Sequence, residues 1–204
     1  RAVDGGVIDI ELMLSRDGFD WQRPFRATHF LARGPSGAFD AGSLFTNSTP
    51  IVLDDEMRFY YGAYSQGATS ADDRTHESGV GVAMLPRDRF AGLGPVAHSD
   101  LPTQQEPLEH VGQVTLKPLS LGRNSQLMLN ADARGGSIRV EILSAAGKRL
   151  HGFTREDAVP VCDDSLSAQV HWRQGGLNDL TPDNYMLRLH LERATVYALY
   201  LNNS

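Results

Sequence analysis

Short runs of apolar, aromatic and β-branched residues, separated by glycine, proline and polar turns, occupy most of the chain. Such runs are typical of many short β-strands. In the first half we expect strands over residues 7–14, 44–45, 50–53, 57–64 and 79–85. Their spacing is that of an antiparallel meander rather than of βαβ units, and helical periodicity is sparse. The pattern therefore predicts an all-β fold.

In the second half, apolar residues recur two apart, which places each set on one side of a half-buried strand. The sets are Leu127 with Leu129, Ile138 with Val140 and Ile142, and Leu187 with Leu189 and Leu191. Gly135-Gly136 separates two of these strands at hairpin distance, and Gly147 marks the turn that closes the next. The last pair, residues 185–191 and 195–201, predicts a further hairpin. Two such sheets packed face to face form a β-sandwich.

A segment without periodicity divides the two halves. It contains Pro95, Pro102 and Pro107 among many polar residues, which indicates a connector. The sequence thus predicts a first β region over residues 1–94, a connector over 95–112 and a sandwich over 113–204.

Composition and charge exclude several classes of partner. The chain has 204 residues, of which 41% are hydrophobic and 22% charged, enough for one large or two small cores. Its net charge is −6 and the two signs are interspersed, so no face is built to neutralise phosphates or anionic lipid. No stretch approaches the ~20 apolar residues of a membrane-spanning helix. We therefore expect neither nucleic acid nor a membrane as a partner.

Cysteine and histidine usage gives no sign of a cofactor. Cys162 is the single cysteine, so neither an intrachain disulfide nor a Cys-rich zinc site can form. The histidines lack His-Glu-x-x-His or similar ligand spacing. Aspartate pairs such as Asp54-Asp55 are typical of solvated turns, with calcium binding as the alternative. We predict no cofactor.

The segment from Ser15 to Trp21 reads as a tight turn after an apolar strand. Asp17 can cap backbone N–H groups, Gly18 can take a positive φ, and Trp21 can pack under the turn. We interpret this segment as structural rather than catalytic.

Asp40 is the candidate site residue on which the sequence places most weight. It lies between small residues, from Gly37 to Ser43, just ahead of a strand. Small neighbours let a ligand approach the backbone closely, and a carboxylate at a strand entry can face a binding funnel. The alternative is an exposed aspartate that caps the turn.

A run of aromatic residues that contains Tyr61 leads into a polar loop ending at His76 and Glu77. A rigid strand, a long loop and a second, glycine-spaced strand are how a binding loop is usually mounted. His76 and Glu77 can bind sugar hydroxyls or act as acid and base. A plain surface loop is the alternative for both.

Two features of the second half each allow a binding role and a structural role. Asn130 and Asp132 lie two apart on one strand face and could bind a cation or a sugar, or could cap the turn before Gly135. Trp172 could stack on a sugar ring, or it could be a core aromatic.

Taken together, the motifs of the first half resemble the closing blades of the five-bladed propellers of glycoside hydrolase families 32 and 43. The motifs are Ser-x-Asp-Gly-x-x-Trp-x-Arg-Pro from Ser15, Phe39-Asp40-x-Gly42, Phe59-Tyr60-Tyr61-Gly62, His76, Gly79-Val80-Gly81-Val82-Ala83 and Arg87-Asp88-Arg89-Phe90. Downstream, Thr115-Leu116-Lys117-Pro118-Leu119, Leu129-Asn130-Ala131-Asp132 and Ile138-Arg139-Val140-Glu141 resemble the β-sandwich behind such propellers.

The resemblance implies glycoside hydrolysis by two carboxylates, one a nucleophile or base and the other a proton donor. On this expectation Asp40 and Glu77 are the catalytic candidates, and His76, Tyr61 and Trp172 contact an oligo- or polysaccharide. The opening-blade aspartate of these families has no counterpart here, and the chain starts at Arg1 rather than Met. We therefore expect an upstream half of the same protein as a partner. A secreted or periplasmic location follows from the resemblance.

Two other functions fit the same sequence. A non-catalytic carbohydrate-binding module needs no missing carboxylate. A structural assembly domain would follow from the open strand edges of a truncated propeller.

Overall fold

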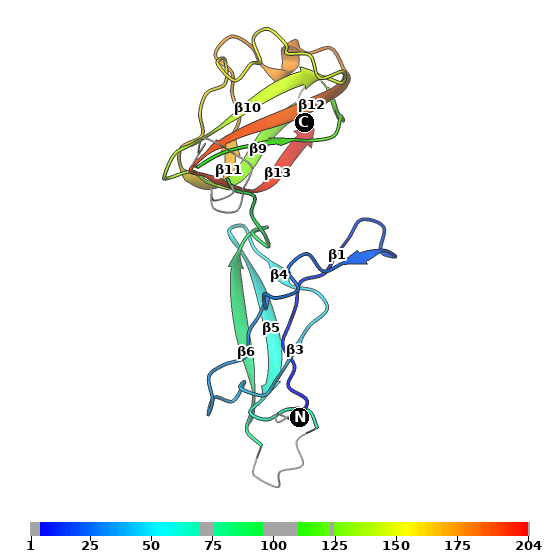
Figure 1. Cartoon of the computed structure of the whole chain (residues 1–204), viewed down its shortest axis with the longest axis vertical. Helices are drawn as coiled ribbons and strands as arrows, with labels where there is room; N and C mark the ends of the chain where they lie inside the picture. Colours follow the sequence, from blue (N-terminus) through cyan, green and yellow to red (C-terminus); the bar gives the residue numbers. More distant parts are fainter. Residues whose placement is uncertain (1–4, 70–75, 96–109, 123–124, 204) are drawn as a thin grey trace, which may run out of the picture. The chain divides into compact units, whose positions relative to one another are not determined.

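The computed structural model describes residues 5–69, 76–95, 110–122 and 125–203 (Figure 1). It is all-β, with 47% strands, and among the described residues the only helical element is the 3₁₀ turn η2 (Leu177–Asp179). The named strands pair antiparallel and no sheet closes on itself. The predicted all-β, antiparallel fold is therefore confirmed. No helix in the described ranges is long and apolar enough to cross a membrane.

The chain divides into two compact units, Arg1–Arg87 (unit 1) and Asp88–Ser204 (unit 2). The sequence places Leu93 in the first β region, whereas in the structure it belongs to unit 2. There it exchanges backbone hydrogen bonds with Val196, at 2.8 and 3.0 Å. Most of the predicted connector, residues 96–109, lies outside the described residues.

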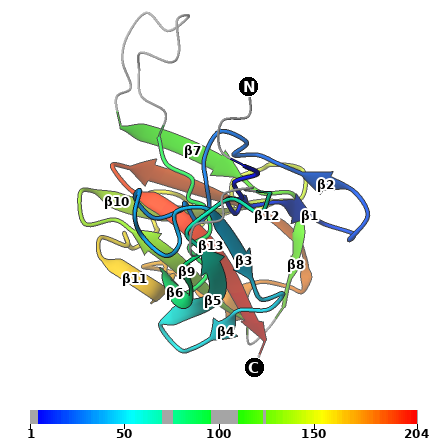
Figure 2. The same ribbon diagram turned by 90° about the horizontal axis from the view of Figure 1, so that it is seen from below.

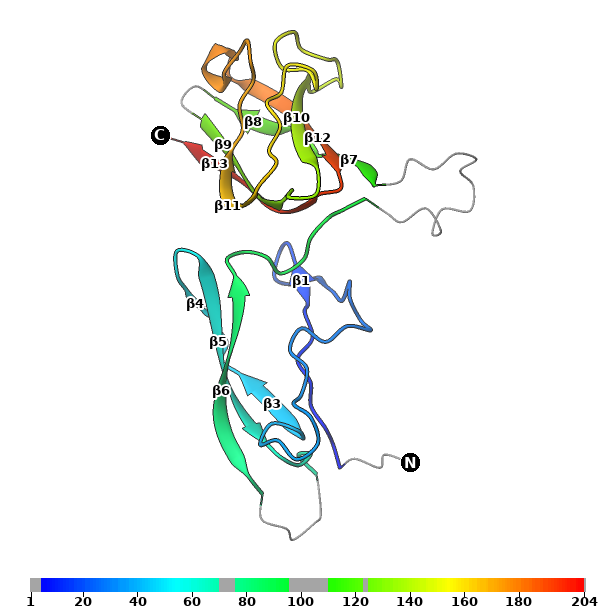
Figure 3. The ribbon, with the colours of Figure 1, turned by 90° about the vertical axis from the view of Figure 1, so that its left-hand side faces the viewer.

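One antiparallel sheet dominates unit 1 (Figure 3). Its strands are β3 (Ser43–Thr46), β4 (Ile51–Val52), β5 (Glu56–Tyr64) and β6 (Ser78–Pro86). β6 pairs with β5 along its whole length, while β3 and β4 share the other edge of β5. Because side chains alternate along a strand, the sheet has two distinct faces.

The inner face of this sheet holds the core of unit 1. Leu44, Met57 and Ala63 are buried there. Two glycines of β6 make room for aromatic rings on the same face: a Cβ at Gly79 would lie 2.7 Å from the Phe39 ring, and one at Gly81 would lie 2.2 Å from the Tyr61 ring. These glycines are therefore required by close packing.

A small hairpin of β1 (Leu14–Ser15) and β2 (Trp21–Gln22) encloses the predicted tight turn. Asp17 Oδ1 accepts hydrogen bonds from the N–H groups of Phe19 and Asp20 at 2.8 and 2.9 Å. The bond from Asp20, followed by that from Phe19, lowers the pKa of Asp17. Gly18 has φ of +79°, as expected. Trp21 is exposed rather than packed under the turn, and its Nε1 donates to the Gly18 carbonyl at 3.1 Å.

Unit 2 contains two antiparallel sheets around one core (Figures 2 and 3). The first comprises β7 (Val111–Thr115), β8 (Leu119–Leu121), β10 (Ser137–Ser144) and β12 (Asp183–Glu192), and the second β9 (Ser125–Asp132), β11 (Asp164–Gln169) and β13 (Thr195–Asn203). The alternating apolar residues recognised in the sequence are almost fully buried between the sheets: Leu127, Leu129, Ile138, Val140, Ile142, Leu187, Leu189 and Leu191.

The predicted hairpin of residues 185–191 and 195–201 is wrong. β12 pairs with β10, β7 and β8, whereas β13 pairs with β9 in the other sheet. Arg193, at φ of +43°, turns the chain from one sheet to the other, and its N–H donates to His110 O at 2.8 Å. Gly135-Gly136 likewise leads from β9 in one sheet to β10 in the other. The period of two identifies the buried side of a strand but not its partner.

The turn after β10 forms as predicted. Gly147 has φ of +78° and donates to Ser144 O at 2.8 Å, while Ser144 N–H donates to Lys148 O at 2.9 Å.

Candidate functional site

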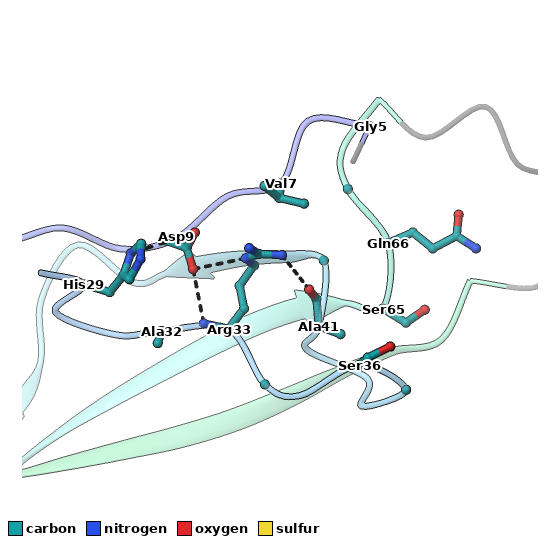
Figure 4. Close-up of a pocket in the computed structure, with 14 residues that line it drawn as sticks. Gly5, Val7, Asp9, His29, Ala32, Arg33, Ser36, Ala41, Ser65 and Gln66 are labelled. Atoms are coloured by element: carbon teal, nitrogen blue, oxygen red, sulfur yellow. Dashed lines mark hydrogen bonds and ion pairs between the residues drawn. The ribbon is translucent and has the colours of Figure 1, made fainter. Parts of the chain in front are cut away.

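A pocket of about 570 Å³ opens in unit 1 (Figure 4). Fourteen residues line it, five of them glycine, and most of the others are small or polar. Small side chains leave the backbone accessible, which is typical of a surface that a ligand approaches closely.

Three segments distant in sequence build the walls. Ile8 N–H donates to Gly42 O at 3.2 Å and Leu44 N–H to Ile8 O at 3.0 Å, which attaches the first segment to the start of β3. Ile10 and Leu31 form a second bridge, which brings the loop after residue 28 alongside. These bridges place Asp9 opposite Arg33.

The Asp9 carboxylate is the centre of the pocket's polar groups (Figure 4). Its Oδ1 accepts hydrogen bonds from the backbone N–H and Nε of Arg33, at 3.2 and 3.1 Å. The same guanidinium donates from Nη1 to the Ala41 carbonyl at 2.9 Å. Oδ2 lies 3.8 Å from Nδ1 of His29, whose side chain is 58% exposed. Arg33 therefore holds one carboxylate oxygen while the other faces an accessible imidazole.

Gly42 fixes the floor of the pocket. A Cβ at this position would lie 2.0 Å from the carbonyl carbon of Gln66, and Ser43 Oγ donates to Gln66 O at 3.3 Å. The backbone of residues 65–67 therefore lies directly against the start of β3, which only a glycine at position 42 permits.

Two of the predicted site residues, Asp40 and Tyr61, are brought together. Tyr61 Oη donates to Asp40 Oδ2 at 3.0 Å. Burial, and then this bond to a carboxylate, raises the pKa of the Tyr61 hydroxyl. A Cβ at Gly34 would lie 2.0 Å from Asp40 Oδ1. Gly34 lines the pocket and Asp40 does not, so this carboxylate lies directly behind one wall.

His76 and Glu77 are exposed just before β6. The backbone of Glu77 pairs with Ser65: Ser65 N–H donates to Glu77 O at 2.9 Å, and Glu77 N–H donates to Ser65 Oγ at 3.1 Å. Ser65 lines the pocket, whereas neither His76 nor Glu77 does. The rest of the predicted binding loop, residues 70–75, lies outside the described residues.

Trp172 lies in the core of unit 2, only 7% exposed. Its Nε1 donates to Val140 O at 2.8 Å, and its ring meets Phe153 edge-on with centroids 5.4 Å apart. This burial favours the core role, which the sequence analysis gave as the alternative for Trp172. The sugar contact stays a prediction.

Asn130 and Asp132 are both held by arginines. Arg89 Nε donates to Asn130 Oδ1 at 2.8 Å. Arg134 donates to both carboxylate oxygens of Asp132, and this lowers the pKa of Asp132 to about 2. A bound guanidinium group occupies the position that a cation would need. No cluster of three or more His, Cys, Asp or Glu suited to a metal ion occurs within the described ranges.

Asp9, Arg33 and His29 were not predicted as site residues from the sequence. Asp9 was an interior residue of the expected strand 7–14. A signal was present, because Arg33-Gly34-Pro35-Ser36-Gly37 combines an arginine with a run of small residues. Only the fold brings Asp9 and Arg33, 24 positions apart, into contact.

No known family model matches this chain, and neither the curated proteins nor the solved structures contain a match. The fold and the pocket define an all-β protein with an open polar site. Its function therefore has to be inferred from the site.

Proposed function

We propose that this chain is a carbohydrate-active protein that binds a glycan in the unit 1 pocket. The main observation in support is the arrangement of Asp9: Arg33 orients one of its carboxylate oxygens and leaves the other near the accessible His29. Carboxylate, guanidinium and imidazole groups together offer acceptors and donors to vicinal hydroxyls. The volume of about 570 Å³ falls within the range of small-ligand pockets.

The geometry favours binding over catalysis by this chain alone. Two carboxylates on either side of a glycosidic bond are needed for hydrolysis. Asp9 is the one carboxylate among the described residues that line this pocket. A non-catalytic carbohydrate-binding role needs nothing more than the described site provides.

A glycoside hydrolase is the second candidate, and Asp40 is the observation that favours it. Its carboxylate lies behind the Gly34 wall and is oriented by Tyr61. In this proposal unit 1 corresponds to closing propeller blades, unit 2 to a β-sandwich, and an upstream half of the same protein supplies the missing carboxylate. The interspersed charge supports a neutral polysaccharide over nucleic acid or a membrane surface. Secretion to the cell exterior or periplasm belongs to the same proposal.

Calorimetric titration of the full chain with a panel of oligosaccharides tests the binding role. We expect Asp9→Asn, which removes the charge and keeps the shape, to weaken binding at least tenfold. Asp20→Asn, an exposed turn aspartate, is the matched control and should bind like the unchanged chain. Absence of binding across the panel, or binding indifferent to Asp9→Asn, would contradict the proposal.

A reducing-sugar assay on the same panel separates the two candidates. Binding without turnover supports the non-catalytic role. Turnover by the unaided chain that Asp40→Asn abolishes would establish the hydrolase and remove the need for an upstream half.

A further inference from the structure

The outer face of the unit 1 sheet is apolar and open. By strand register, the residues opposite the core face include large apolar side chains from all four strands, each exposed: Phe45, Ile51, Tyr60, Tyr64, Val80, Val82 and Met84. Val80 and Met84 are 77% and 64% exposed. A sheet with one solvated face normally carries polar residues there. A contiguous apolar surface of this kind marks an interaction site.

Gly62 forms a hole in the middle of this face. It pairs with Phe45 of β3 on one side and with Val80 of β6 on the other, and Tyr60 and Tyr64 flank it along β5. A cavity of about 520 Å³ lies over it, lined by Phe45, Tyr64 and Val80 among others. Four apolar side chains thus surround Gly62, which has no side chain to fill the space between them.

Among the residues that the structure describes, none accounts for a glycine at position 62. Its φ is not positive, and a Cβ built there would meet no atom of the described residues within 4 Å. Gly79 and Gly81, on the opposite face, each make room for a ring. A glycine in a strand interior weakens the strand, and it is commonly found where another molecule approaches closely. At Gly62 no described residue makes that approach, which leaves room for a second molecule.

The same face carries a side chain that could fill the hole. Met84 is unbranched and flexible, which suits it to filling an irregular gap. The pair Gly62–Val80 lies two residues to one side of the central pair Tyr60–Val82, and the pair Arg58–Met84 lies two residues to the other side. A two-fold axis that lies in the plane between two copies, over the central pair and perpendicular to the line from Gly62 to Met84, would therefore place Met84 of each copy over Gly62 of the other.

Charge does not oppose this pairing. β6, Ser78–Pro86, contains no charged residue. The charged residues of β5 on this face are Glu56 and Arg58, which neutralise each other: Arg58 Nε donates to Glu56 Oε1 at 2.6 Å. The two copies would therefore bring no unpaired like charges together.

The exposed apolar area is also sufficient. If a large side chain has an area of about 150–250 Å², the exposed surface of these three aromatic and four aliphatic side chains amounts to roughly 650 Å². A standard interface takes about 800 Å² from each partner, and the rim of the face can supply the difference. A sugar is a poorer fit, because glycan recognition needs several convergent polar groups and this cavity offers mainly Ser78 and the Tyr64 hydroxyl.

We propose that this outer face is the interface of a two-fold dimer of the chain, in which Met84 of each copy fills the hole over Gly62 of the other. The proposal is independent of glycan binding in the pocket, because none of the outer-face residues lines that pocket.

Analytical ultracentrifugation of the full chain over a wide concentration range tests the proposal. We expect a reversible monomer–dimer equilibrium. Gly62→Val fills the hole and Met84→Lys removes the inserting group, so each should weaken the dimer at least tenfold. Phe19→Lys replaces a side chain that is 88% exposed outside this face and should leave the dimer unchanged.

Gly62→Val is also the check on folding, since valine favours strands and a Cβ at this position has free space. Its circular dichroism and melting temperature should equal or exceed those of the unchanged chain. A monomer at every concentration would overturn the proposal and leave the face to a different polypeptide. A dimer that is as tight in folded Gly62→Val as in the unchanged chain would overturn it as well.

Discussion

Arg89 donates a hydrogen bond from Nε to the Oδ1 atom of the fully buried Asn130, 41 residues away, at 2.8 Å. The same guanidinium pairs with Asp164, and its central carbon lies 4.7 Å from the centroid of the Tyr197 ring. One arginine at the start of unit 2 thereby joins β9, β11 and β13.

Arg89→Ala should destabilise the chain by about 2–3 kcal/mol, because it leaves a buried amide oxygen without its donor and removes charged hydrogen bonds. Denaturant unfolding followed by circular dichroism measures the loss. Arg134→Ala, which removes a guanidinium that is 68% exposed, is the matched control and should cost clearly less stability than Arg89→Ala. Equal losses for the two variants would contradict the structural role of Arg89.

Trp172→Phe should also destabilise unit 2, by about 1–3 kcal/mol, because Val140 O loses its donor in a buried site. Trp172→Ala should cost more, about 3–5 kcal/mol, since it also leaves a cavity beside Phe153. Thermal unfolding gives the order of the two. Glycan affinity of folded Trp172→Phe should be unchanged, and a selective loss of affinity would restore the sugar-stacking role.

The period-two pattern was sufficient to predict β9, β10, β12 and β13, because each inward residue faces one shared core, whereas β7, β8 and β11 were not predicted. It could not predict their partners. Leu187 and Leu199 follow the same alternation, yet β12 and β13 belong to different sheets. Which strand pairs with which depends on contacts far apart in the chain, and local turns such as Gly135-Gly136 look alike in a hairpin and between two sheets.

The candidate site was predictable only in part, for a related reason. Asp40 and Tyr61 were both identified because each sits in a distinctive local motif, and the fold brings them into contact. Asp9 has no distinctive neighbours in the sequence. Its role depends on the hydrogen bond from Arg33, and two isolated backbone bridges bring the two residues together. Trp172 shows the limit from the other side, since a tryptophan in a polar segment can lie in the core, as this one does.

Arg33→Lys tests how the pocket depends on the shape of the guanidinium group. A lysine keeps the charge but cannot donate to Asp9 and to the Ala41 carbonyl at once. We expect a loss of about 1 kcal/mol in stability and a several-fold loss of glycan affinity, because Asp9 is no longer held in one orientation. Calorimetry and thermal unfolding measure the two effects. Arg26→Lys, an exposed change outside the pocket lining, should alter neither.

The pH dependence of stability should show the pairing of Asp132 with Arg134. The hydrogen bonds from the Arg134 side chain lower the pKa of Asp132 from 3.8 to about 2 in the folded chain. A group with a depressed folded pKa stabilises the fold fully above its unfolded pKa, and this contribution is lost as pH falls through the folded value. The unchanged chain should therefore lose melting temperature between about pH 4 and pH 2 more steeply than Asp132→Asn, which has no proton to bind. Asp20→Asn, an exposed aspartate of the β1–β2 turn, should keep the steeper slope. If Asp132→Asn loses stability as steeply as the unchanged chain over this range, Arg134 does not hold the carboxylate in its ionised form.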